Sequence, residues 1–278
     1  MRDIRYLKSI EEMKIPEMEL YVSNKEVHLL RYYEPEPGIF IAESKNVIER
    51  ALSKGFKPIS VIALPEKLKE EALFDEIGDV PIFAGELKLL QEFLGYKLTS
   101  GITCAMRRKK APDYKEVIKD AKRIGVMEAC VNPTNLGAIF RSAAALGIDA
   151  LLLSPACVDP LYRRAIRVSV GNVFLIPWAY IGYNEEEWKT KGVEMLKAEG
   201  FTTVAMALRE DNVNINDERL KACDKLAIIM GTEGDGLCDN TIASCDYVAK
   251  IPMANEVDSL NVSVAASLAF WELGTVNQ

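Results

Sequence analysis

Residues 226–237 carry the sequence LAIIMGTEGDGL, in which a five-residue apolar run leads directly into a loop with three glycines. A continuous apolar run without polar alternation is typical of a strand that is covered on both faces, as in a parallel sheet. The glycines allow the backbone to turn tightly, to approach a ligand and to present its N–H groups. A tight turn is the simplest interpretation, because the spacing matches neither a dinucleotide fingerprint nor a phosphate-binding P-loop.

The same alternation of apolar runs and helical segments continues through the second half of the chain. It predicts an α/β fold with a parallel sheet, whose ligands would bind at the carboxyl ends of the strands. The final helix has apolar residues all round, so we expect it to be buried. The expected strands are 125–131, 150–153, 173–177, 202–208, 226–230 and 247–251, and the expected helices are 136–146, 161–169, 185–198 and a last one from Ser259.

The first third of the chain is expected to form a smaller α/β domain. Its strands are expected at 38–42, 59–63, 80–84 and 101–106, and its helices at 45–53, 66–77 and 87–94. The segment RRKKAP at residues 107–112 then has the composition of a linker, so we place two domains at 1–112 and 113–278. The four cations of this run form either a solvated connector or a patch that faces RNA.

The overall charge of the chain argues at first against a nucleic-acid partner. The 278 residues carry a formal charge of −7, whereas phosphate binding usually leaves a basic footprint. The charge is uneven, however: it is −4 over residues 1–102, +6 over 103–180 and −9 over 181–278. The basic segment 103–180 is compatible with an RNA partner, although the net charge of the whole chain is negative.

Composition also excludes several classes of site and compartment. The single histidine, His28, lies in an apolar run and is expected to be structural, which removes His-dependent catalysis and His-rich metal sites. The six cysteines have no CxxC spacing and are expected to be reduced thiols, without metal. No signal segment or membrane span is evident, so we expect a soluble cytoplasmic protein.

Two further segments place polar side chains next to expected strands. Residues 132–141, NPTNLGAIFR, put Asn135 where a helix should begin, as an N-cap, and surround Arg141 with apolar neighbours. We therefore expect Arg141 at a buried edge, with an anionic partner or a function. In residues 251–266, Asp258 or Ser259 is the expected N-cap of the last helix, with Asn261 in its first turn.

These three segments together resemble the signature motifs of the SpoU (TrmH-type) RNA ribose 2′-O-methyltransferases of the SPOUT superfamily. The resemblance covers residues 124–273 and rests on NLGAIFR, MGTEGDGL, and IPM followed by SLNVSVA, in the order of the family. It implies a C-terminal parallel-sheet domain with a trefoil knot, preceded by a small α/β RNA-binding domain. Asn255 replaces the family's usual glycine in the third motif, and asparagine tolerates positive φ best after glycine. Asn172 similarly replaces a small residue after Gly171.

The resemblance also implies a role for particular residues. It assigns S-adenosylmethionine as the cofactor, no metal, RNA as the partner and a homodimer as the assembly. The implied catalytic residues are Asn135, Arg141, Glu233, Ser259 and Asn261. The implied cofactor-binding residues are Ala205, Met206, Met230, Gly231, Glu233, Gly234, Ile251, Met253, Leu260 and Asn261. The RNA-binding candidates are Arg107, Arg108, Lys109, Arg163 and Arg164.

The function expected from this set is methylation of a ribose 2′-hydroxyl, with ribosomal RNA favoured over tRNA by analogy. Methyl transfer from a sulfonium needs in-line positioning and neither metal nor histidine. A guanidinium scarcely deprotonates, so we expect Arg141 to clamp the adjacent phosphate rather than act as a base. The alternatives are a tRNA 2′-O-methyltransferase, a non-catalytic RNA-binding protein with the knotted fold, and a different small-molecule α/β enzyme.

Overall fold

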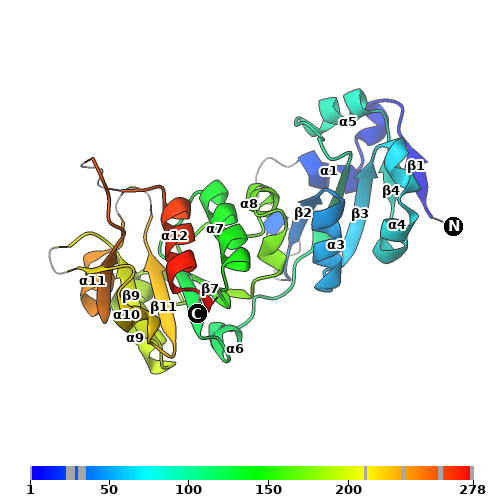
Figure 1. The fold of residues 1–278 in the computed structure, drawn as a ribbon. Coiled ribbons are helices and arrows are strands. Elements are labelled where there is room, and N and C mark those ends of the chain that lie inside the picture. Colours follow the sequence, from blue (N-terminus) through cyan, green and yellow to red (C-terminus); the bar gives the residue numbers. More distant parts are fainter. Residues whose placement is uncertain are drawn as a thin grey trace. The chain divides into compact units, whose positions relative to one another are not determined.

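A seven-stranded sheet built from the second half of the chain is the largest element of the structure (Figure 1). Its strand order is β10-β12-β9-β11-β6-β7-β8, and every neighbouring pair is parallel. The predicted α/β fold with a parallel sheet is therefore confirmed. The strands are β6 (Arg123–Met127), β7 (Ala150–Leu153), β8 (Trp178–Tyr180), β9 (Thr202–Met206), β10 (Val213–Asn214), β11 (Leu226–Met230) and β12 (Tyr247–Lys250).

Helices cover both faces of this sheet. On one face, residues of α6 (Tyr114–Ile118), α9 (Glu185–Ala198) and α11 (Asp239–Ser244) share a buried apolar cluster with the strands. On the other face, α7 (Pro133–Ala145) packs against α12 (Val262–Leu273), where Ser142 Oγ lies 2.7 Å from Ser267 Oγ. The short helix α10 (Glu218–Lys221) follows β10.

Glycine permits the close approach of α12 to the sheet. A Cβ atom on Gly125 of β6 would lie 2.9 Å from Cζ of Phe270 and 2.6 Å from Cδ2 of Leu151. Both atoms belong to buried side chains in a packed core, so any Cβ atom at this position would force the Phe270 ring and the Leu151 side chain to shift.

The computed structural model describes residues 2–22, 29–30, 36–209, 212–232, 234, 236–255 and 259–275. His28, Glu233 and Asp258, all singled out from the sequence, lie outside these residues. The chain divides into two compact units, Met1–Lys110 with Leu161–Phe174, and Ala111–Pro160 with Leu175–Gln278. Among the described helices, none has the length and apolar character needed to cross a membrane.

The first unit contains a mixed five-stranded sheet of order β1-β4-β3-β5-β2. Strands β1, β4 and β3 pair in parallel, whereas β5 is antiparallel to both β3 and β2. The strands are β1 (Ile4–Tyr6), β2 (Ile39–Glu43), β3 (Pro58–Ala63), β4 (Ile82–Ala84) and β5 (Ile102–Arg107). The described helices are η1 (Glu11–Met13), α1 (Pro16–Val22), α3 (Lys45–Ser53), η2 (Pro65–Lys69), α4 (Glu71–Ile77) and α5 (Leu87–Leu94).

A segment from the middle of the chain belongs to this first unit, although its sequence position placed it in the second domain. It consists of α8 (Arg163–Val168) and η3 (Asn172–Phe174). Arg50 of α3 donates to Asn172 Oδ1 at 2.6 Å, and the Phe174 ring lies 5.4 Å from that of Phe40. The predicted strand 173–177 is therefore wrong, because Val173 and Phe174 belong to a 3₁₀ turn and the next strand, β8, begins only at Trp178.

Candidate functional site

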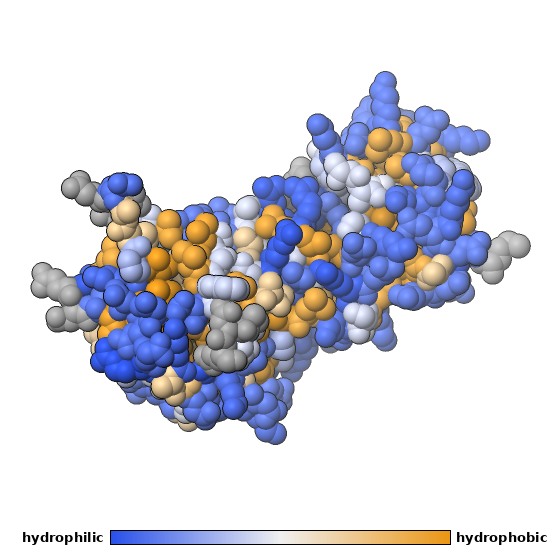
Figure 2. Space-filling model, viewed as in Figure 1, coloured by the Kyte–Doolittle hydropathy of each residue, from blue (hydrophilic) through white to orange (hydrophobic). Residues whose placement is uncertain are grey.

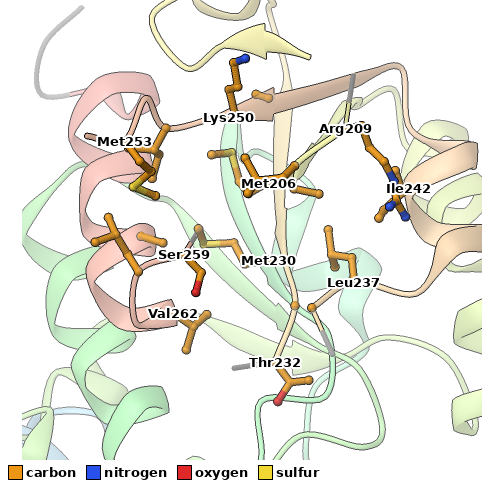
Figure 3. A pocket seen from close by; sticks show the side chains of 18 of the residues that line it. Met206, Arg209, Met230, Thr232, Leu237, Ile242, Lys250, Met253, Ser259 and Val262 are labelled. Carbon is orange, nitrogen blue, oxygen red and sulfur yellow. The ribbon is translucent and has the colours of Figure 1, made fainter. Parts of the chain in front are cut away.

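A cavity of about 310 Å³ lies at the carboxyl ends of β9, β11 and β12. Met206 and Met230 are the last residues of β9 and β11, and Ile251 follows the end of β12. Figure 3 shows the side chains of Met206, Met230 and Met253 around the same space, with the Ser259 hydroxyl beside them. The cavity thus lies at the edge where parallel sheets bind their ligands and where the sequence predicts the ligand site.

The glycine loop after β11 forms one wall of the cavity. Thr232 and Gly236 pair across the loop in an antiparallel bridge, and Gly236 has a φ of +70°. A Cβ atom on Gly231 would lie 2.2 Å from the backbone carbon of Gly236, so no larger residue fits there. The predicted tight turn is therefore confirmed for the residues of this loop that the structure describes.

The segment that precedes α12 forms the facing wall. Ile251, Met253, Ser259 and Leu260 line the cavity. Asn255 adopts a φ of 56°, so this asparagine does occupy a left-handed position, as its replacement of glycine predicted. Asn255 thus adopts the backbone conformation that the glycine would favour.

The first turns of α7 and α12 bring Asn135 and Asn261 together. The Asn261 Nδ2 group donates to Asn135 Oδ1 at 3.2 Å, and Asn135 is buried. The predicted caps are wrong in both helices. Asn132 caps α7 and Asn261 caps α12, because each accepts a hydrogen bond from the amide two residues on, at Thr134 and Ser263. Asn135 therefore lies within α7 and needs an explanation other than capping.

Arg141 lies on the exposed surface of α7, which corrects the expectation of a buried edge. Its apolar neighbours Ile139, Phe140 and Ala143 are buried on the core side of the helix, while the arginine lies outside that face. Within the described part of the chain, the structure gives its guanidinium no hydrogen bond or ion pair. Arg141 is thus available to an external anion.

The cavity contains most of the predicted cofactor-binding residues. Met206, Met230, Gly231, Gly234, Ile251, Met253 and Leu260 line it, as does the predicted catalytic residue Ser259. Ala205 is instead fully buried within β9, and Asn261 contacts Asn135 outside the lining. Sequence reasoning missed lining residues that lie just beyond β9, on the far side of the glycine loop and on the unpredicted helix α11. They include Leu208, Arg209, Leu237 and Ile242, and the last residue of β12, Lys250, was missed as well.

The RNA-binding candidates lie in the first unit and have unequal surroundings. Arg108 is buried and donates through Nε to the Ile39 carbonyl at 3.0 Å. Lys109 donates to the Lys54 carbonyl and lies over the Phe56 ring. Lys109 is nevertheless exposed, as are Arg107 and Arg164, so that Arg108 alone of these four residues is buried.

Arg163, the fifth candidate, packs against an acidic group. Its guanidinium lies 3.8 Å from the centre of the Tyr96 ring, and its Nε lies 3.2 Å from Glu43 Oε1. Burial raises the pKa of Glu43, and the nearby Arg163 and Arg167 guanidiniums oppose that rise. Arg163 therefore has a structural partner within the first unit.

Comparisons with known proteins agree with this geometry. The SpoU rRNA Methylase family model matches residues 122–271. An uncharacterized tRNA/rRNA methyltransferase of Mycobacterium tuberculosis is 34% identical over 238 residues, which cover 84% of this chain and 80% of the relative. The AdoMet-bound rRNA methyltransferase from Sinorhizobium meliloti superposes with a TM-score of 0.80 at 21% identity, covering 98% of this chain and 97% of that one.

A second solved structure extends this likeness. The SpoU methyltransferase AviRb from Streptomyces viridochromogenes gives a TM-score of 0.74 at 21% identity, with 95% of each chain covered. The family match over more than half of the chain confirms the predicted family. This chain belongs to the SpoU rRNA methylase family, a family of RNA methyltransferases that use S-adenosylmethionine.

Proposed function

We propose that this protein transfers the methyl group of S-adenosylmethionine to a ribose 2′-hydroxyl of RNA, with ribosomal RNA as the favoured substrate. The observation that carries the proposal is the meeting of three distant segments at one edge of the parallel sheet. The second and third motifs line the cavity, and Asn261 of the third motif hydrogen-bonds Asn135 of the first. Such convergence of distant segments is expected of a functional site rather than of three independent turns.

The cavity suits a cofactor of this type in size and lining. Its volume of about 310 Å³ lies at the lower end of the range of small-molecule sites. Apolar side chains dominate the lining, Thr232 and Ser259 add hydroxyls, and Gly231 brings backbone close to the space. Met206, Met230 and Leu260 would hold the cofactor, and bound S-adenosylmethionine would supply a methyl group that a hydroxyl oxygen can accept without a metal.

Arg141 binds the substrate in this proposal. Its exposed guanidinium would clamp a phosphate next to the target ribose through paired hydrogen bonds, and so orient the 2′-hydroxyl. Arg141→Lys keeps the charge but loses the planar fork, so we expect the single-turnover rate on saturating RNA to fall at least ~10-fold. Affinity for S-adenosylmethionine should be unchanged, and a variant with near-full rate would contradict this role.

The exposed cations of the first unit are the proposed RNA-binding surface. Arg107, Lys109, Lys110, Arg164 and Arg167 are exposed, although Arg167 also lies 4.0 Å from Glu43, whereas Arg108 is buried. Charge reversal of Arg107 and Lys110 should therefore weaken RNA binding at low salt and leave cofactor binding intact. Unchanged RNA affinity in that double variant would sink this part of the proposal.

The proposal includes a homodimer that is formed through α12. This helix was expected to be buried all round, but Val264, Leu268 and Trp271 are 47%, 41% and 53% exposed on one stripe. Figure 2 shows hydrophobic surface in the region of α7 and α12. An apolar stripe at this spacing suits a second helix of the same kind. Leu268→Glu should convert a dimer into a monomer in light scattering, and a monomeric parent protein would refute the assembly.

The trefoil knot belongs to the same proposal. In the sheet, β9 and β11 lie between β12 and β6, and yet α12, the helix that follows β12, packs over β6 and beside α7. A last segment that returns in this way suits the threaded helix of the family, although ordinary connections do not thread loops.

The experiment that tests the function measures methyl transfer from radiolabelled S-adenosylmethionine to purified RNA. Ribosomal RNA and tRNA from cells that lack this protein serve as separate substrates, so that the target nucleotide is unmodified. We expect label in ribosomal RNA. Label in tRNA alone would identify a tRNA methyltransferase, and RNA binding without cofactor binding would identify a non-catalytic RNA-binding protein.

A further inference from the structure

Glu128 is a buried acid that none of the three motifs contains. It directly follows β6 and is only 4% exposed. Its backbone amide donates to the carbonyl of Met230 at 2.8 Å, which places Glu128 next to the end of β11 and the start of the glycine loop. A carboxylate is rarely buried unless hydrogen-bond donors surround it.

Four donors from two other segments surround this carboxylate, the weakest being the Cys238 thiol at 3.9 Å from Oε2. The backbone amide of Cys238 donates to Oε1 at 2.6 Å. The indole Nε1 of Trp188 and the hydroxyl of Thr241 both donate to Oε2, at 2.7 and 2.6 Å. An ionised carboxylate only accepts hydrogen bonds, so an acid matches this set of donors.

The sequence of α9 makes room for one of these donors. A Cβ atom on Gly192 would lie 2.2 Å from Cε3 of Trp188, one helical turn earlier. Glycine costs helix stability at an interior position, and here it allows the indole to lie flat against the helix. The Trp188 side chain is consequently 1% exposed, with its N–H held on Glu128.

The partners of Glu128 adjoin one wall of the cavity. Leu237 and Ile242 line the cavity, and each is the chain neighbour of a residue that donates to Glu128, Cys238 and Thr241 respectively. The carboxylate therefore ties the end of the glycine loop and the start of α11 to β6 and α9. If the end of the glycine loop and the start of α11 could move, the space that the cofactor needs would widen or close.

We propose that Glu128 is a positioning residue, which fixes the glycine loop and α11 in the conformation that binds S-adenosylmethionine. This inference rests on the proposed function, because it assumes that the cavity takes the cofactor. A purely structural carboxylate would affect unfolding alone. A positioning carboxylate also changes the affinity of the folded protein for the cofactor, with no effect on its affinity for RNA.

The test is the change Glu128→Gln, with Asp246→Asn as a matched control. Glutamine keeps the shape of the glutamate side chain. Its amide N–H group, however, would face one of the hydrogen-bond donors that surround Glu128, so at least one of these hydrogen bonds is lost. Asp246 also accepts two hydrogen bonds from one residue, Thr203, but at the amino ends of β9 and β12, away from the cavity. Calorimetry well below the unfolding temperature should show a Kd for S-adenosylmethionine that rises on the order of tenfold in Glu128→Gln. The Kd of Asp246→Asn for S-adenosylmethionine should be unchanged. The affinity of both variants for RNA should also be unchanged.

A milder variant keeps the inference testable if Glu128→Gln does not fold. Thr241→Val has the same shape and removes only one donor, so the Kd for the cofactor should rise severalfold in a folded protein. Wild-type affinity in either folded variant would overturn the positioning role, as would an equal loss in Asp246→Asn. Failure of the parent protein itself to bind S-adenosylmethionine would instead refute the proposed function.

Discussion

The two edges of the seven-stranded sheet are built from the same strands and differ in what their polar groups contact. At the carboxyl edge, β9, β11 and β12 end at a cavity that is bounded by glycine backbone and the exposed Ser259. At the amino edge, the Arg123 guanidinium is buried and donates to the carbonyls of Leu273, Asp224 and Lys221 at 3.0 to 3.1 Å. Protein groups thus satisfy the Arg123 guanidinium at the amino edge, while glycine backbone and the hydroxyls of Thr232 and Ser259 border an open cavity at the carboxyl edge.

This difference separates stability from binding within one sheet. Buried polar groups must be hydrogen-bonded, so the closed amino edge stabilises the fold. Arg123 also lies at the C-terminal carbonyls of α10 and α12, where a cation is favoured by the helix dipole. The carboxyl edge instead depends on loop conformations that only particular residues can adopt, such as Gly231 and Asn255. Substitutions at the amino edge should therefore change the free energy of unfolding, and substitutions at the carboxyl edge should change cofactor affinity.

The largest effect is expected from Gly231→Ala at the carboxyl edge. The new Cβ would overlap the backbone of Gly236 and Leu237, at 2.2 and 2.4 Å, so the loop must refold. We expect the Kd for S-adenosylmethionine to rise about 100-fold, equivalent to ~2.8 kcal/mol. Calorimetry measures this change, and wild-type affinity would show that the loop is not part of the binding wall.

An intermediate effect is expected from Arg123→Met at the amino edge, and it concerns stability rather than cofactor affinity. Methionine retains much of the apolar volume but leaves buried carbonyls without their donor, so the free energy of unfolding should fall by about 2 kcal/mol. Denaturant unfolding measures this loss. The Kd for the cofactor in the folded protein should stay within twofold, and a large change in it would break the separation of the two edges.

The smallest effect concerns Asp246 and the pH dependence of stability. Burial raises the pKa of this acid, but hydrogen bonds from the Thr203 amide and from Lys197 outweigh burial, so its pKa is lowered. A lowered folded-state pKa gives stability that is present above the unfolded-state value of 3.8 and is lost as the pH falls through the folded-state value.

Asp246→Asn should accordingly remove part of the acid dependence of unfolding below about pH 4. The amount is expected to be less than about 1 kcal/mol, because the side chain is 37% exposed and solvent screens its ion pair. Thermal unfolding of both proteins from pH 3 to pH 7 checks this. Parallel curves for the variant and the parent protein would contradict it.

Sequence patterns predicted those parts of the fold that depend on local periodicity. The boundaries of β7, α9 and β11 agree with the prediction because each is a strong run with clear ends. The helix caps were wrong because several residues near each start can cap, and only the folded chain selects Asn132 and Asn261. Residues 173–177 were assigned to a strand because their apolar side chains fit one, whereas Phe174 packs on Phe40 and ends a 3₁₀ turn.

The residues of the candidate site that belong to a sequence motif could be predicted. The residues that only tertiary contacts bring to the site could not. The motifs identified Gly231, Met253 and Ser259, which line the cavity. No pattern along the chain could connect Glu128 with Trp188, because 60 residues separate the two. The surface position of Arg141 was also missed, since buried neighbours on a helix do not determine which side an intervening residue faces.

The most direct test of the central claim identifies the atom that receives the methyl group. The protein is incubated with unmodified ribosomal RNA and S-adenosylmethionine that carries a deuterated methyl group, and the RNA is digested to nucleosides for mass spectrometry. We predict a deuterated methyl group on a ribose, at the 2′-oxygen of one nucleoside. A deuterated methyl group on a base, or none on RNA despite cofactor binding, would contradict the account.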